Sequence, residues 1–445
     1  MTASRAGSKR KPEVSSGDWH LRSIALAAGA ITGIIGTAFK FGIASGYSRY
    51  VRLLTLGNRG SFRGWLLAAL SGAAMVAAAA FLTQRFAPEA AGSGIQEIEG
   101  TLAGARPRLR WVEVILVKFF GGLLAMSSGL VLGREGPTVA IGACVGAALA
   151  RFRPDTKDRN EANTLVSSGS AAGLAVAFNA PVGGILFVLE ETRREFPVDL
   201  RSAQCVILAT VSAIIVSLLI SGHVRILPIP IYQSPTLLEL VLVLPFAALT
   251  GAYGAFLNAA LLKTLKLVRA LKLQIGWLTV AFIIGGAIGT LVWCFVDATG
   301  EGGDLTVRLL RGPQTLELLL LLILVRTVVF TISYSSGTPG GIFTPLVAFG
   351  AMGGLLFAGC VELLVPGLKL EPGKFAVAGM AALLTATVRA PLTSVALVVE
   401  MTGDFQLLLM ALFASIVADV AANELGGRPI YEQLLDRTLR LGRPR

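Results

Sequence analysis

The chain has 445 residues, of which 54% are apolar types and only 15% are charged, and its mean hydropathy is +0.72. Soluble globular chains carry about 25% charged residues, so this composition argues against a soluble all-helical protein. The four cysteines lie in apolar stretches without CxxC spacing, and two histidines leave no histidine-based metal cluster. No phosphate-binding GxxxxGK[ST] loop is present. We therefore predict an α-helical, polytopic membrane protein with no metal and no cofactor.

The two ends of the chain contribute to the net charge of +12. Residues 1–22 are polar and basic, without the pattern of a cleavable signal, and residues 433–445 form a second short basic tail. Because basic segments are retained in the cytoplasm, we expect a protein of the inner (cell) membrane with both ends on the cytoplasmic side. Neither tail interleaves aromatic residues with its basic ones, so nucleic-acid binding is not favoured.

The apolar blocks fall into two classes in chain order. Seven are long enough to span a bilayer: 24–45, 65–84, 113–132, 203–221, 236–262, 277–296 and 316–334. Five are shorter or are interrupted by Gly and Pro: 136–150, 164–179, 182–190, 374–388 and 391–401. Interrupted membrane helices are typical of half-helices that meet near the midplane.

A Pro-rich linker, 222–235, separates a first membrane repeat, 23–221, from a second, 236–432. Residues 297–313 have the composition of an aqueous loop. Residues 117–143 align with 325–351 at an offset of 208, so that Ser-Ser-Gly, Gly, Pro and Gly-Ala recur in register. NAPVGGILFVLEET, from residue 179, likewise aligns with RAPLTSVALVVEMT, from 389. A duplicated membrane protein with matching breaks is typical of secondary transporters, and the breaks favour an inverted repeat.

Two of the breaks predict an anion site. Glu135 and Phe343 occupy equivalent positions, and Pro137 and Pro345 follow each of them at an early helical position that suits proline. Helix N-termini expose free N–H groups and a positive dipole end, so two that face each other create a site for an anion. Kinked packing helices are the alternative for GGIFTP, and a buried Arg134–Glu135 pair is the alternative for GREGP.

Glu135 explains why a charge is tolerated inside an apolar block. When ionised, its carboxylate competes with an anion for the helix N-termini; when protonated, it leaves them to the anion. One side chain can thus act as a gate and as a proton acceptor. A third break, GSGIQEIEG, presents Ser93 either as a helix cap or as a hydroxyl turned toward the anion.

Three further polar residues remain open to two interpretations. Glu190 and Glu191 end an apolar run either as a solvated helix end or as a route for protons toward Glu135. Glu190 has a repeat partner in Glu400, whereas Glu191 does not, which favours Glu191 as the specialised residue. Tyr431 is either an interfacial anchor or a hydroxyl donor to the anion.

GSGIQEIEG, GREGPTVAIGA, AFNAPVGGILFVLEE, SSGTPGGIFTP and GGRPIY occur in the order found in the CLC chloride channels and chloride/proton antiporters, which this chain resembles over roughly residues 20–435. The match is closest to short bacterial members without a regulatory domain. The resemblance implies an inverted-repeat fold of about eighteen helices and a homodimer with one pore in each subunit. Gln96 departs from the family, which usually has proline there.

The resemblance also assigns roles. It implies Glu135 as the gating glutamate, Glu191 as the internal proton glutamate, with Glu190 as a helper, and Lys118 as a residue that raises the potential of the pore. The residues implied around the anions are Gly92, Ser93, Arg134, Gly136, Ile342, Phe343, Thr344 and Tyr431.

We therefore predict a chloride/proton antiporter, with a passive chloride channel on the same fold as the leading alternative. Glu191 favours the antiporter, because family channels usually lack an acid at that position. A sodium-coupled amino-acid carrier would need cation-binding carboxylates and carbonyls at the breaks. The breaks in this sequence instead predict helix N-termini, which donate hydrogen bonds to anions, so this alternative is not favoured. The absence of HExxH and GxSxG motifs argues against an intramembrane hydrolase, so we expect no enzymatic activity.

Overall fold

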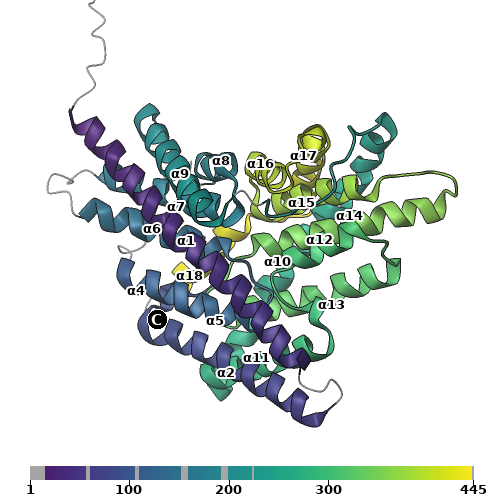
Figure 1. The fold of residues 1–445 in the computed structure, drawn as a ribbon, viewed down its shortest axis with the longest axis horizontal. Helices are drawn as coiled ribbons and strands as arrows, with labels where there is room; N and C mark the ends of the chain where they lie inside the picture. The colour runs from purple at the N-terminus through teal and green to yellow at the C-terminus, as the bar shows by residue number, and fades with distance from the viewer. Residues whose placement is uncertain are drawn as a thin grey trace, which may run out of the picture.

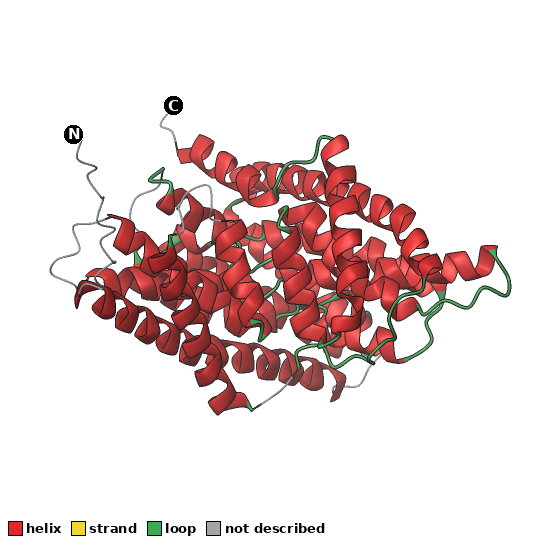
Figure 2. Ribbon diagram, turned by 90° about the horizontal axis from the view of Figure 1, so that it is seen from above, coloured by secondary structure: helices red, strands yellow, loops and turns green. Residues whose placement is uncertain are grey.

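The computed structural model describes residues 16–56, 61–105, 110–151, 159–191, 199–222 and 225–442. Figure 2 shows that this part of the chain is helical, with loops between the helices. Eight of the described helices are long and apolar enough to cross a membrane. The prediction of an all-α, polytopic membrane protein is therefore confirmed.

The first half of the chain supplies nine of the described helices. They are α1 (Ser16–Leu56), α2 (Phe62–Phe86), α3 (Ile95–Leu102), α4 (Trp111–Leu116), α5 (Gly122–Ser127), α6 (Glu135–Arg151), α7 (Arg159–Phe178), α8 (Pro181–Glu190) and α9 (Leu200–Ser221). A π-helical turn, Val117–Gly121, joins α4 to α5, so these two form one continuous helix.

The second half repeats this plan. Its helices are α10 (Leu237–Ile275), α11 (Trp277–Cys294), α12 (Gly303–Arg311), α13 (Leu316–Ser335), α14 (Phe343–Leu364), α15 (Pro372–Val388), α16 (Pro391–Thr402), α17 (Leu408–Glu424) and α18 (Ile430–Gly442). Residues 225–235, within the predicted linker, contain no helix.

Three segments contain helix that the sequence analysis did not predict. The tail predicted at 1–22 is helical from Ser16 onward, and the tail predicted at 433–445 is helical through Gly442; the residues before 16 and after 442 lie outside the described part. The aqueous loop predicted at 297–313 contains α12. All three segments are amphipathic or polar, so a search for apolar blocks passes over them.

Equivalent glycines bring equivalent helices together in the two halves. Gly142 of α6 lies against Gly169 of α7, and Gly350 of α14 lies against Gly379 of α15. A β-carbon at any of these glycines would collide with the carbonyl of the glycine opposite. Small residues allow membrane helices to approach this closely, and the two contacts are related by the same repeat that the sequence shows.

Two half-helices at the junction of the halves show that the repeat is inverted. Figure 1 places α8 next to α16. The Glu190 carboxylate, at the end of α8, accepts hydrogen bonds from the amides of Leu392 (3.1 Å) and Thr393 (2.8 Å) in the first turn of α16. The Glu400 carboxylate, at the end of α16, accepts from Val182 and Gly183 in the first turn of α8, at 3.0 and 2.8 Å. Each helix end meets the other helix's beginning, so the pair is antiparallel.

These reciprocal caps predict matched losses of stability. A carboxylate at a helix N-terminus satisfies free N–H groups and opposes the positive dipole end, so Glu190→Gln and Glu400→Gln should each lower the free energy of unfolding by about 1 kcal/mol. Thermal unfolding in detergent measures the loss. The control is Glu424→Gln, at an exposed position in the last turn of α17, which should leave the free energy of unfolding unchanged. Equal stability of all three variants contradicts the capping role.

Candidate functional site

The loops before three helices are tied together by backbone hydrogen bonds. The Gly133 amide donates to the Gly341 carbonyl at 2.9 Å, and the Gly341 amide donates back to Gly133 at 2.6 Å. The Gly92 amide donates to Thr338 at 2.9 Å, and the Gly340 amide donates to Gly92 at 3.0 Å. These bonds hold the N-termini of α3, α6 and α14 around one buried region. The predicted convergence of helix N-termini is therefore present.

The Glu135 carboxylate occupies the N-terminus of the opposite half-helix. Its Oε1 atom accepts from the Phe343 amide at 2.5 Å, and its Oε2 atom accepts from the Thr344 hydroxyl at 3.1 Å. The side chain is fully buried. Its oxygens lie so close to the α-carbons of Gly133 and Gly341 that a β-carbon at either would collide with them. The carboxylate thus takes the position, at free N–H groups, that an anion would take.

Arg134 does not pair with Glu135, which rules out a buried pair between these neighbours. Its guanidinium donates instead to the Ala177 carbonyl at 3.1 Å and to Glu301 at 3.2 Å. Arg134, Glu301 and Thr344 all line a vestibule of about 700 Å³. Five basic and three acidic residues lie on its walls: Lys40, Arg52, Arg134, Arg225, Arg308, Asp297, Glu301 and Asp304. Since the Thr344 hydroxyl also donates to Glu135, the Glu135 carboxylate lies next to this vestibule.

Two hydroxyls near Glu135 are buried without a hydrogen bond of normal geometry. They are the Ser93 Oγ and the Tyr431 hydroxyl, whose side chains lie close enough to interact with each other. The N-cap residue of α3 is Gly94, and no side chain caps this helix, so Ser93 is not a helix cap. Tyr431 is 0% exposed and packs on the Phe343 ring, so it is not an interfacial anchor. Buried hydroxyls normally have partners, and these two are left for a ligand.

Some of the backbone amides around this region already donate hydrogen bonds within the protein. The Gly92 amide bonds to Thr338, and the Ser93 amide donates to the Tyr334 hydroxyl at 3.3 Å. The Ile342 amide, in contrast, has no acceptor among the described residues. Gly136 lies so close to Ser93 that any side chain there would collide with the serine. The donors available to a ligand in this region are therefore the Ile342 amide and the hydroxyl groups of Ser93 and Tyr431.

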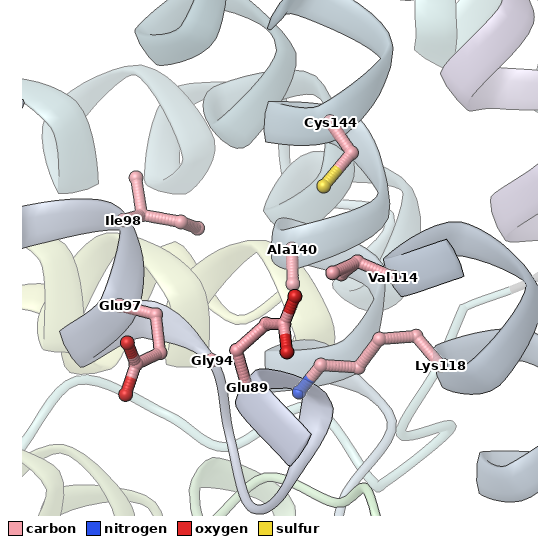
Figure 3. A pocket seen from close by; sticks show the side chains of 8 residues that line it. All are labelled: Glu89, Gly94, Glu97, Ile98, Val114, Lys118, Ala140 and Cys144. Carbon is pink, nitrogen blue, oxygen red and sulfur yellow. The ribbon is translucent and has the colours of Figure 1, made fainter. Parts of the chain in front are cut away.

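Lys118 lies behind the Ser93 loop and is fully buried. Its Nζ atom donates to the carbonyls of Gly92 and Ser93, both at 2.8 Å. Figure 3 shows Lys118 among the side chains that line a small cavity, together with Glu89 and Glu97. Lys118 belongs to the π-helical turn, and such turns frequently occur at functional sites. The lysine therefore fixes the loop with its charge while placing that charge close to the site.

The repeat partner of Lys118 makes the same kind of contact elsewhere. Arg326 is fully buried in α13 and donates to the carbonyls of Asp297, Thr299 and Gly300, each at 2.9 Å. Those carbonyls belong to the loop that carries Glu301, the partner of Arg134. Each half thus uses a buried cation to hold a loop next to the site.

The two glutamates at the end of α8 have different environments. Glu190 is held by the first turn of α16, with the Thr393 hydroxyl as a third donor at 2.8 Å. The Glu190 carboxylate therefore caps α16, and the helper role for protons that the resemblance implies stays a prediction. Glu191 is the residue after α8, is half-buried, and lies near Tyr431.

Two residues at the site were absent from the sequence prediction. Glu301 lies in the segment predicted as an aqueous loop, and its pairing with Arg134 has no sequence signal. Tyr334 directly precedes the repeated Ser-Ser-Gly, so its position beside a predicted break was a usable signal.

Comparisons with known proteins place this chain among relatives of one family. A family model described as "Voltage gated chloride channel" matches residues 73–423. The H(+)/Cl(-) exchange transporter ClcA of Vibrio parahaemolyticus serotype O3:K6 is 41% identical over 432 residues, which are 96% of this chain and 92% of that protein. ClcA of Vibrio cholerae serotype O1 (strain M66-2) is 42% identical over 423 residues, 94% of this chain and 89% of that protein.

A solved structure shares the fold. The crystal structure of a slow cyanobacterial Cl-/H+ antiporter superimposes with a TM-score of 0.89 at 32% identity, covering 94% of this chain and 98% of that one. The family match spans well over half of the chain, and the relatives exceed 30% identity over nearly their whole lengths. The chain therefore belongs to the CLC family of voltage-gated chloride channels and transporters, as a short, multi-pass membrane member.

Proposed function

We propose that the protein exchanges chloride for protons across the membrane, as a secondary active transporter. The observation that carries the proposal is the Glu135 carboxylate bound to the Phe343 amide and the Thr344 hydroxyl, where an anion would bind. A carboxylate that must leave this position before an anion enters, and that becomes neutral by taking a proton, links the two ions. The similarity to ClcA exchange transporters and to a Cl-/H+ antiporter favours exchange over a passive channel.

Each site residue has a role in the proposed cycle. When Glu135 is protonated and leaves the Phe343 amide and the Thr344 hydroxyl, chloride binds at the amides of Ile342 and Phe343, beside the Ser93 and Tyr431 hydroxyls. Chloride then also reaches the N-terminus of α6, at the amides of Arg134 and Gly136, beside Thr344. Lys118 strengthens anion binding through its buried charge and through the Gly92–Ser93 carbonyls that it holds. Glu191 passes protons between Glu135 and one side of the membrane.

The ion movements are electrogenic in this proposal. Chloride and protons move in opposite directions, so both carry charge the same way, and each elementary charge that crosses 100 mV involves about 2.3 kcal/mol. Membrane potential should therefore drive transport. No cofactor and no enzymatic step enter the cycle.

The orientation and assembly belong to the same proposal. The basic residues of both ends support a protein of the inner (cell) membrane with cytoplasmic termini, so the vestibule lined by Arg134 and Glu301 opens to the outside. The family resemblance extends the proposal to a homodimer. All the site residues come from one chain, which supports one complete pore in each subunit.

Proton flux in liposomes that contain only this protein tests the proposal. A chloride gradient is imposed, potassium with valinomycin clamps the voltage, and the external pH is followed. We expect chloride to drive protons against their own gradient. Chloride flux without proton movement would identify a channel, and a well-folded preparation without chloride flux would contradict the anion site itself.

A further inference from the structure

Tyr334 is built into the loop that carries Ser93. It lies in the last turn of α13 and is only 5% exposed. The Ser93 amide donates to its hydroxyl oxygen at 3.3 Å. A β-carbon at Gly92 would come within 2.9 Å of the same oxygen, so only glycine leaves room for the phenol at this point.

The hydroxyl proton of Tyr334 has no acceptor in the described part of the chain. A phenol both accepts and donates, and here the Ser93 amide uses an acceptor position. Other tyrosines away from the site are satisfied: Tyr50 bonds to the Ala68 carbonyl at 3.1 Å, and Tyr253 pairs with Thr327 at 2.7 Å. Tyr334 therefore keeps a donor that is free for a ligand.

This donor lies beside the two hydroxyls already assigned to the anion. Tyr334 lies close to Tyr431 and to Glu135, and it accepts a hydrogen bond from the residue that carries the Ser93 hydroxyl. Three buried hydroxyl groups thus lie next to the gating carboxylate. Buried polar groups rarely lack partners, and one small monovalent anion would satisfy all three donors together.

The repeat shows that this hydroxyl is specific to one half. At the offset of 208, Tyr334 corresponds to Met126, which has no donor. Glu135 and Phe343 differ between the halves in the same way. The symmetric scaffold therefore carries an asymmetric site, with the gate from the first half and the additional donor from the second.

On the basis of the proposed function, we infer that Tyr334 is a third hydroxyl ligand of the transported anion. Its phenol takes the hydrogen bond of the Ser93 amide and presents its own O–H to the anion in place of that amide. The halide at this position is held by side-chain hydroxyls to a greater extent than the sequence motifs predict, and Tyr334 helps to set its affinity.

Chloride binding to the detergent-solubilised protein, measured by titration calorimetry, tests the assignment. Tyr334→Phe should weaken binding by about tenfold, the effect of losing one hydrogen bond to a charged group. Tyr253→Phe is the matched control, since it removes a buried hydroxyl that is already paired with Thr327, and it should bind chloride as the wild type does. Unchanged affinity of Tyr334→Phe overturns the inference.

Incorporation of 3-fluorotyrosine at position 334 separates a ligand from a purely structural hydroxyl, and it keeps the shape of the side chain should the phenylalanine variant fail to fold. Fluorine makes the phenol a stronger donor and a weaker acceptor. In buffer acidic enough to keep the phenol protonated, a ligand role predicts tighter chloride binding. A role limited to accepting the Ser93 amide predicts equal or weaker binding, which contradicts the assignment.

The outcome is separable from that of the proposed function. If the wild-type protein couples chloride to protons in liposomes while both changes at position 334 leave chloride affinity unaltered, only the Tyr334 inference fails. If the wild type itself neither binds nor transports chloride, the proposed function fails first.

Discussion

Glu135→Ala is expected to abolish proton transport while chloride still passes. The variant removes the proton acceptor and leaves the Phe343 amide and the Thr344 hydroxyl, which hold the carboxylate in the wild type, open to an anion. Proton flux in voltage-clamped liposomes should fall to the level of protein-free liposomes, while chloride efflux remains clearly above that level. Chloride affinity should rise, because the competing negative charge is gone.

Two companion variants sharpen this test. Glu135→Gln retains the shape of the side chain without its charge or its titration, so it should lose proton transport as the alanine variant does. Glu301→Gln removes a carboxylate from the wall of the same vestibule and should keep chloride and protons coupled. Chloride flux that stays strictly coupled to protons in Glu135→Ala would remove Glu135 from the gate.

The fold was predictable where its signals are local or repeated. Apolar length identified most spans, and the register of Ser-Ser-Gly, Gly and Pro between the halves identified the duplication. The short amphipathic helices α12 and α18 were missed because neither has an apolar block, and the long helix α10 extends well past its apolar block. The direction of the repeat required the structure, since only the reciprocal caps of α8 and α16 show that the halves are inverted.

The site was predictable to the extent that motifs mark helix breaks. Glycine and proline at each break predicted helix N-termini, and the structure brings those of α3, α6 and α14 together through the Gly133–Gly341 and Gly92–Thr338 bonds. The resemblance contributed Tyr431, whose position in the sequence alone was equally compatible with a membrane-interface anchor.

Partner choices were not predictable, because they depend on contacts between distant segments. Arg134 could have paired with its neighbour Glu135, yet it bonds to Glu301, 167 residues away. Glu190 and Glu191 are adjacent and chemically identical, yet it is Glu190 whose carboxylate accepts hydrogen bonds from the first turn of α16. A motif gives the identity of a functional residue, whereas its partner is set by the packing of the two halves.

Glu191→Gln is expected to uncouple the two ions without removing the chloride pathway. Glu191 follows the last residue of α8, is half-buried, and lies near Tyr431, so it lies on an approach to the site. Glutamine keeps the size and the hydrogen-bonding shape of the side chain but does not carry a proton. Proton flux driven by a chloride gradient should fall by at least about tenfold, a difference of 1.4 kcal/mol in the barrier to proton transfer, while chloride flux persists.

Glu190→Gln is the matched control for this prediction, because it makes the same change one residue earlier on the same helix end. Its carboxylate is engaged by the first turn of α16, so the variant should lose stability and retain coupling, whereas Glu191→Gln should retain stability and lose coupling. Measuring both quantities in both variants separates a proton route from a helix cap. Unchanged stoichiometry in Glu191→Gln would return Glu191 to the role of a residue at the membrane edge, and protons would then have to reach Glu135 by a route that does not use α8.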